Sequence, residues 1–108
     1  MTPRHEIGVV SDFVAGAARQ VIVAGHPVCV VRTGDGQLHA IDDTCTHADV
    51  SLAEGDVEGH TIECWLHGSR FSLDTGQPTG LPATVPVAVH DIEIDGERVL
   101  VALKEKTP

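Results

Sequence analysis

Short runs of alternating β-branched residues recur along this chain and are bounded by glycine. Residues 19–41 hold two such runs joined by Asp35-Gly36, a dipeptide typical of two-residue hairpin turns. Residues 85–103 repeat the pattern around Asp95-Gly96, with valines and isoleucines at alternate positions. Residues 11–20 are compatible with a brief helix, but Gly16 makes a loop equally suitable. The pattern therefore predicts an all-β fold built on hairpins.

Between these strand-rich ends lies a different segment, residues 43–83, which is richer in cysteine, histidine, glycine and proline. The 108 residues, 42% of them hydrophobic, suffice for one compact domain with a modest core. We therefore expect a single domain, 1–108, with an antiparallel sandwich or barrel-like base formed by residues 1–42 and 84–108. Residues 43–83 would form a small inserted subdomain that carries the chemistry.

Charge and composition narrow the possible partners. Sixteen acidic and seven basic residues give a formal charge of −9, which disfavours nucleic acids and anionic membranes and favours a basic protein surface. The N-terminus lacks an apolar run behind its charges, and no stretch is long enough to cross a bilayer. We thus expect a soluble, cytoplasmic protein. Three cysteines are too few for a disulfide scaffold, so metal binding is the expected use of the thiols.

Two short motifs in the middle segment pair a cysteine with a histidine. Cys45 and His47 form C-x-H, and Cys64 and His67 form C-x-x-H after sixteen intervening residues. One-residue spacing puts two side chains on the same side of an extended loop, and Gly68 allows the second loop to turn tightly. The four side chains can therefore converge on a metal. A structural Cys2His2 zinc site accepts the same donors, but its usual spacings pair cysteine with cysteine and histidine with histidine.

This arrangement resembles the Rieske family, in which C-x-H and C-x-x-H loops hold a [2Fe-2S] cluster. The resemblance covers nearly the whole chain, because "CTH", "CWLHGSRFSLDTG" and "QPTGLPATVPV" follow in family order between the hairpins. It implies a Rieske-like fold and one cluster per chain, with Cys45 and Cys64 on one iron and His47 and His67 on the other. The residues that it implies around the cluster are Trp65, Leu66, Gly68, Ser69, Pro78, Gly80, Leu81 and Pro82.

The resemblance also implies a low reduction potential within the family range of about −150 to +300 mV. High-potential members carry a disulfide between the two loops, but this chain has Val50 and Leu66 at those positions. Those members also use a tyrosine hydroxyl near a ligand sulfur, whereas the matching residue is Phe71 and the chain contains no tyrosine. Ser69 keeps one hydroxyl that can bond a cluster sulfide and favour the reduced state.

The resemblance further implies a ferredoxin that carries single electrons from a flavin reductase to a non-haem iron, ring-hydroxylating oxygenase. Such a carrier is not itself an enzyme and has no small-molecule substrate. A chain of 108 residues also cannot supply an oxygenase's mononuclear iron site and substrate pocket. Two alternatives stay open: a Rieske donor in another pathway, such as iron-sulfur assembly or a nitrite-reductase-like system, and a zinc-stapled interaction module.

Individual residues outside the four ligands carry weaker expectations. Trp65 either belongs with Leu66 to an exposed apolar collar that docks partners or packs beneath its loop. Cys29, in an apolar run, is expected in the core. Arg70 is expected to be a solvated surface arginine. The remaining histidines have no partner at ligand spacing and are expected to be ordinary surface or strand residues: His5, His26, His39, His60 and His90.

Overall fold

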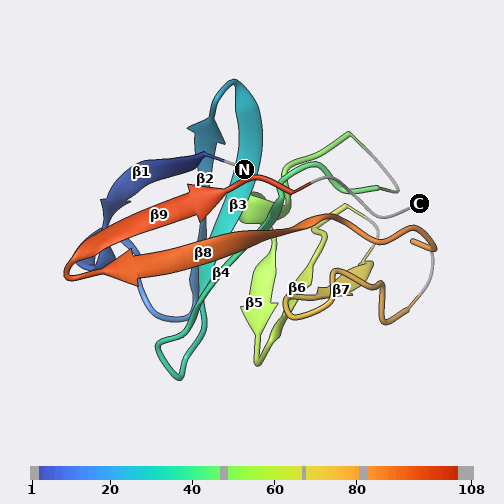
Figure 1. The fold of residues 1–108 in the computed structure, drawn as a ribbon. Helices are drawn as coiled ribbons and strands as arrows, with labels where there is room; N and C mark the ends of the chain where they lie inside the picture. The colour runs from blue at the N-terminus through green and yellow to red at the C-terminus, as the bar shows by residue number, and fades with distance from the viewer. Residues whose placement is uncertain (1–2, 47–48, 67, 81–82, 105–108) are drawn as a thin grey trace.

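The computed structural model describes residues 3–46, 49–66, 68–80 and 83–104 (Figure 1). Among those residues there is no α-helix, and the only helical segments are the 3-10 turns η1 (Val10–Asp12) and η2 (Leu52–Glu54). The predicted all-β fold class is confirmed. The strands are β1 (Arg4–Val9), β2 (Ala17–Val23), β3 (His26–Arg32), β4 (Leu38–Asp42), β5 (Asp56–Glu58), β6 (Thr61–Glu63), β7 (Arg70–Ser72), β8 (Val89–Asp95) and β9 (Arg98–Ala102).

The larger sheet contains both predicted hairpins. Its antiparallel strands follow the order β1-β9-β8-β4-β3-β2, so the N-terminal and C-terminal hairpins meet where β4 pairs β8. In the C-terminal hairpin Asp95 pairs with Arg98, which leaves Gly96 and Glu97 as a two-residue turn. Residues 11–20, whose sequence is compatible with a brief helix, do not form an α-helix. The 3-10 turn η1 ends at Asp12, and β2 begins at Ala17.

The turn at Asp35-Gly36 is longer than the two residues that the dipeptide predicts. Arg32 pairs with Leu38, and the backbone N–H of Thr33 donates to the carbonyl of Gln37 at 2.9 Å. The Asp35 carboxylate accepts hydrogen bonds from the Thr33 hydroxyl and from the Gln37 N–H. These side-chain bonds stabilise a five-residue connection over the tighter alternative.

The smaller sheet consists of β5, β6 and β7 and lies beside the larger one (Figure 1). All three strands fall within residues 43–83, the segment predicted to be inserted; the division of the domain at those bounds stays a prediction. A core cluster joins this sheet to the base, because Val31 and Ile41 of the large sheet pack with Ile62, Phe71 and Leu73. A second cluster fills the base alone and includes Phe13, Val23, Val28, Val99 and Val101.

Candidate metal centre

Cys45 and Cys64 begin two loops that are closed in the same way. The Cys45 N–H donates to the carbonyl of Val50 at 3.0 Å, and the Cys64 N–H donates to that of Ser69 at 2.6 Å. The backbone N–H of each cysteine thus donates to the carbonyl of the residue five positions further along the chain. Both thiols are buried, at 2% and 1% exposure, and both belong to the core cluster shared by the two sheets. Two thiols from loops nineteen positions apart in sequence therefore belong to one core cluster.

The predicted nitrogen ligands, His47 and His67, lie outside the described residues, as do Leu81 and Pro82. Gly68, directly after His67, has a φ of +76°, a left-handed conformation that a side chain rarely adopts. Its N–H donates to the carbonyl of Cys64 at 3.0 Å. The tight turn predicted for the second loop is confirmed at this glycine.

The segment after β7 lies against the second loop. Ser69 is fully buried, and its hydroxyl oxygen accepts a hydrogen bond from the Ala83 N–H at 3.1 Å. Phe71 forms an isolated antiparallel bridge with Pro78, which is half-buried, and Thr79 donates its N–H to the carbonyl of Arg70 at 2.7 Å. Gly80 is exposed. The proline-bearing segment therefore contacts the second loop and β7; its role as a third loop over the cluster stays a prediction.

The rim of the second loop is apolar and open to solvent. Trp65 is 52% exposed and Leu66 is 42% exposed, although both follow the buried Cys64 directly. The alternative in which Trp65 packs beneath its loop is therefore wrong. Val85 is 47% exposed, and its carbonyl accepts a hydrogen bond from the hydroxyl of Thr46, which lies next to Cys45. Exposed apolar side chains thus lie in the second loop and in the segment that contacts the first loop.

A buried carboxylate that sequence reasoning missed anchors the first loop. Asp43, 1% exposed, accepts hydrogen bonds from the Ala53 N–H at 3.0 Å and from the Gln20 amide at 2.5 Å. Its carbonyl also accepts from the Leu52 N–H at 2.6 Å. These bonds fix the end of β4 and η2 on either side of Cys45. No spacing signal marks Asp43, since the partners of its carboxylate come from two separate segments, β2 and η2.

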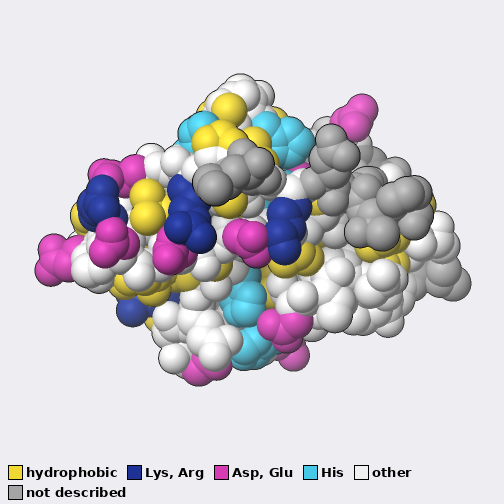
Figure 2. All heavy atoms as spheres, viewed as in Figure 1, with side chains coloured by type: hydrophobic (Ala, Val, Ile, Leu, Met, Phe, Trp, Pro, Cys, Tyr) yellow, Lys and Arg dark blue, Asp and Glu magenta, His cyan; other side chains and the backbone are white. Residues whose placement is uncertain are grey.

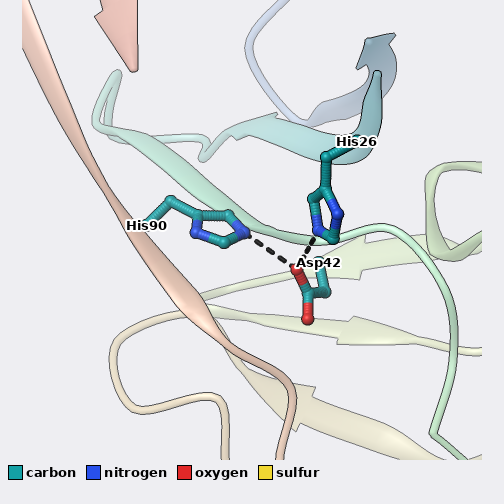
Figure 3. Close-up of side chains that lie close together, drawn as sticks. All are labelled: His26, Asp42 and His90. Carbon is teal, nitrogen blue, oxygen red and sulfur yellow. Dashed lines mark hydrogen bonds and ion pairs between the residues drawn. The ribbon is translucent and has the colours of Figure 1, made fainter. Parts of the chain in front are cut away.

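The neighbouring Asp42 is shared by two histidines (Figure 3). His26, at the start of β3, and His90, on β8, both direct Nε2 at Asp42 Oδ1, at 2.7 and 2.8 Å. Burial alone would raise the pKa of Asp42, but the hydrogen bonds from His90 and then His26 outweigh it and hold the pKa at about 2. The carboxylate is thus ionised and ties β3, β4 and β8 together next to the first loop.

The expectations for Cys29 and Arg70 have different outcomes. Cys29 is fully buried in the shared core, as predicted, and burial followed by the charge of Asp43 raises the pKa of its thiol. Arg70 is only partly solvated: its side chain is 28% exposed and donates to Thr61 Oγ1 and Glu63 Oε2, both at 3.0 Å. It lies opposite Glu63 in the β6–β7 register, and this pairing explains the burial.

The remaining histidines lie on strands or in a surface turn, as expected, but four of the five have partners that the sequence did not reveal. His26 and His90 share Asp42, whereas His39 and His60 pack edge to face with ring centroids 5.3 Å apart. Each pair is made by residues from different strands or turns, so no local spacing could reveal it. His5 lies on β1 and has no contact of this kind with the part of the chain that the structure describes.

The donor set fits the sulfur half of an iron-sulfur site. Two thiols lie at equivalent positions of two loops, and none of the three cysteines is in a disulfide. Among the described residues, no helix is long and apolar enough to span a membrane. The absence of a thiol at Val50 and Leu66 rules out an interloop disulfide at those positions.

Comparison with known proteins places this site in a family. A model of the Rieske [2Fe-2S] domain matches residues 4–101. Ferredoxin CarAc of Metapseudomonas resinovorans is 43% identical over 97 residues, covering 89% of this chain and 90% of that protein. The structure of the ferredoxin of carbazole 1,9a-dioxygenase from Nocardioides aromaticivorans IC177 superposes with a TM-score of 0.89, at 36% identity, covering 95% of this chain and all of that one.

A further solved structure is a complex of reduced oxygenase and oxidised ferredoxin in carbazole 1,9a-dioxygenase; its matching chain has a TM-score of 0.90 and 38% identity, with both chains fully covered. These findings confirm the predicted Rieske-like fold, the [2Fe-2S] cofactor and the role of a ferredoxin, an electron-transfer component rather than an enzyme. The chain belongs to the Rieske [2Fe-2S] domain family.

Proposed function

We propose that this ferredoxin carries single electrons from a flavin reductase to a non-haem iron, ring-hydroxylating oxygenase. The observation that carries the proposal is the pairing of two buried thiols with an exposed apolar rim, Trp65 and Leu66, immediately after the second thiol. A carrier needs a protected redox centre close to a surface that partners can contact and leave. The relative crystallised with the oxygenase of carbazole 1,9a-dioxygenase supports the choice of acceptor.

Within this proposal, Cys45 and Cys64 hold the cluster through sulfur, and His47 and His67 hold it through nitrogen. The [2Fe-2S] cluster, when bound, supplies reversible uptake of one electron. The protein contributes burial of the two thiols, which excludes water from the sulfur side. Leu52, Ile62 and Phe71, all fully buried, pack in the same cluster as the thiols.

We infer a low potential for this centre. Phe71 is fully buried and offers no hydroxyl, and the chain contains no tyrosine that could donate to a ligand sulfur. The Ser69 hydroxyl is the donor that remains. Potentiometric titration is expected to give a midpoint in the lower part of the family range of about −150 to +300 mV. The potential should also fall as pH rises, because reduction makes imidazole ligands more basic and couples electron uptake to proton uptake.

Partner contacts would be transient. Trp65 and Leu66 offer a small apolar contact area, and the formal charge of −9 steers encounter toward basic partner surfaces. Association should therefore slow as ionic strength rises. We also infer a cytoplasmic setting, since none of the three cysteines is in a disulfide.

A coupled assay tests the proposal. The purified protein should be brown, with two irons and two labile sulfides per chain. Visible absorption should bleach when NADH and a flavin reductase are added anaerobically, and it should recover when an oxidised oxygenase is added. A colourless protein with a single zinc would contradict the proposal, and reduction without transfer to any oxygenase would favour another electron acceptor.

A further inference from the structure

Four side chains from three turns and one strand meet at the end of the small sheet away from the cysteines. His39 lies on β4, Asp35 in the β3–β4 loop, His60 in the β5–β6 turn and Asp74 in the turn after β7. Figure 2 shows histidine side chains beside acidic ones along the lower edge of this face, between the β3–β4 hairpin and the β5–β6 turn. His60 and Cys64 flank β6, so the group lies roughly 13 Å along that strand from the thiol.

Asp35 fixes which nitrogen of His60 carries the proton. The carboxylate accepts from the Thr33 hydroxyl and the Gln37 N–H, and these bonds lower its pKa to about 2. An ionised carboxylate only accepts hydrogen bonds, so His60 Nε2, at 3.1 Å from Asp35 Oδ2, is the donor. In the neutral ring, His60 Nδ1 therefore carries a lone pair, and it lies 3.7 Å from Asp74 Oδ1.

His39, on β4 of the larger sheet, lies near the same oxygen, Asp74 Oδ1. Its Nδ1 lies 3.9 Å from Asp74 Oδ1, and its side chain is 11% exposed. Its Nε2 is buried and has no hydrogen-bond partner among the described residues, so Nδ1 is the ring nitrogen that faces Asp74. Burial lowers the pKa of His39, so the ring is neutral near pH 7.

These distances fit metal coordination better than hydrogen bonding. His39, His60 and Asp74 each offer one donor atom within 4.8 Å of the other two. His39 Nδ1 and His60 Nδ1 lie 3.9 and 3.7 Å from Asp74 Oδ1, which is too far for a hydrogen bond. Ligands at about 2.1 Å from a tetrahedral zinc ion are about 3.4 Å apart. Contraction of a few tenths of an ångström would bring both nitrogens to that distance from Asp74 Oδ1.

We propose that His39, His60 and Asp74 bind a Zn²⁺ ion, with Asp35 orienting His60 and a water molecule as the fourth ligand. Hydrogen bonding of the other ring nitrogen to a carboxylate is the usual support of a zinc-bound histidine. Asp74 is 60% exposed, so the fourth position faces solvent. His39 belongs to the base sheet and the other two ligands to turns of the small sheet, so the ion clamps the two sheets together.

The chain contains a control for this site. His26, Asp42 and His90 also offer donors within 4.8 Å of one another. However, His90 Nδ1 accepts the Lys104 N–H at 2.9 Å, so its Nε2 must carry the proton that it donates to Asp42. That nitrogen has no lone pair for a metal. The second group is therefore a hydrogen-bonded structural group and should not bind zinc.

The experiment titrates Zn²⁺ into the chelator-washed holoprotein by calorimetry, with the visible spectrum checked before and after to confirm that the cluster is intact. We expect one zinc ion per chain and a rise in the unfolding temperature. His60→Ala and Asp74→Asn, both at exposed positions, should weaken binding at least tenfold, and His26→Ala should leave it unchanged. Asp35→Asn should weaken it by about tenfold to a hundredfold, as loss of an orienting partner does.

Binding should also weaken as pH falls, because protons compete for His60 Nδ1, and the hydrogen bond that His60 donates to Asp35 raises the pKa of that ring. The proposal is overturned if the wild-type holoprotein binds no zinc at neutral pH. It is equally overturned if His60→Ala and Asp74→Asn, with unchanged cluster spectra, bind zinc as tightly as the wild type.

Discussion

The hydroxyl of Ser69 accepts the backbone N–H of Ala83 at 3.1 Å, and this bond is buried. It joins the loop that follows Cys64 to the proline-bearing segment, fourteen residues further along the chain. Because the oxygen is already an acceptor, the hydroxyl hydrogen is left to donate elsewhere. In the proposed centre its acceptor is a cluster sulfide.

Ser69→Ala should therefore have two effects. Loss of a hydrogen bond that favours the reduced cluster by about 1 kcal/mol lowers the midpoint potential by ~40 mV for one electron. The unpaired N–H of Ala83 destabilises the fold by about 1–3 kcal/mol. Potentiometry and thermal unfolding of the holoprotein measure the two effects separately.

Ser72→Ala is the matched control, because the Ser72 hydroxyl accepts from the backbone N–H groups of Asp74 and Thr75 at exposed positions. It should leave the potential unchanged. An equal potential shift in both variants would show that the Ser69 hydroxyl has no particular bond to the cluster.

The three cysteines allow a test of the ligand assignment at constant burial. Cys29, Cys45 and Cys64 are exposed by 0%, 2% and 1%, and all three belong to one core cluster. Cys45→Ala and Cys64→Ala should abolish the visible spectrum and the bound iron. Cys29→Ala should keep both and cost about 1 kcal/mol of stability, since it deletes only a small buried group. Iron content per chain is the measurement; a colourless Cys29→Ala protein contradicts the assignment.

Gly55 packs closely against the backbone of Glu63, the residue before Cys64. A Cβ at this position would lie 1.8 Å from the carbonyl oxygen of Glu63, although the φ of −88° is one that any residue adopts. Gly55→Ala should therefore destabilise the protein by about 1–3 kcal/mol or more, because backbone must move. It should also reduce cluster occupancy, since the displaced carbonyl precedes a ligand.

Gly34→Ala is the control for this prediction, because a Cβ there meets nothing within 4 Å. Chemical denaturation of both variants gives the comparison. Equal stability of the two variants would contradict the prediction, because it would mean that the backbone before Cys64 shifts without a loss in the free energy of unfolding.

The two histidines that share Asp42 differ in burial, and their substitutions should differ accordingly. The His90 side chain is 1% exposed and also accepts the Lys104 N–H, whereas that of His26 is 47% exposed. His90→Ala should cost about 2–4 kcal/mol because it leaves a cavity and an unpaired N–H. His26→Ala should cost under about 1 kcal/mol. Similar losses in urea denaturation would contradict this ranking.

Asp42 itself should contribute a pH-dependent term to stability. Its pKa of about 2 in the folded protein lies below the ordinary value of 3.8, so folding favours the ionised form. The contribution is fully present above pH 4 or so and is lost as pH falls toward about 2. The stability difference between wild type and Asp42→Asn should therefore be constant near neutrality and shrink below about pH 4. A constant difference down to pH 2 would contradict the lowered pKa.

The alternating valines and isoleucines around Gly96 and the two cysteine-histidine motifs were sufficient to predict the all-β class, the family and the cofactor. These signals are local: strand periodicity repeats every two residues, and a metal-binding loop concentrates its donors within a few positions. The burial of Cys29 followed in the same way from its apolar neighbours.

What the tertiary structure alone decided are contacts between residues far apart in the chain. His26 and His90 stand 16 and 48 positions from Asp42, and His60 stands 25 positions from Asp35, so no spacing rule relates them. Their meeting depends on the order of strands in the large sheet and on how the small sheet packs against it. Sheet order and packing are set by burial of the whole core at once, whereas motif chemistry is encoded in a few consecutive residues.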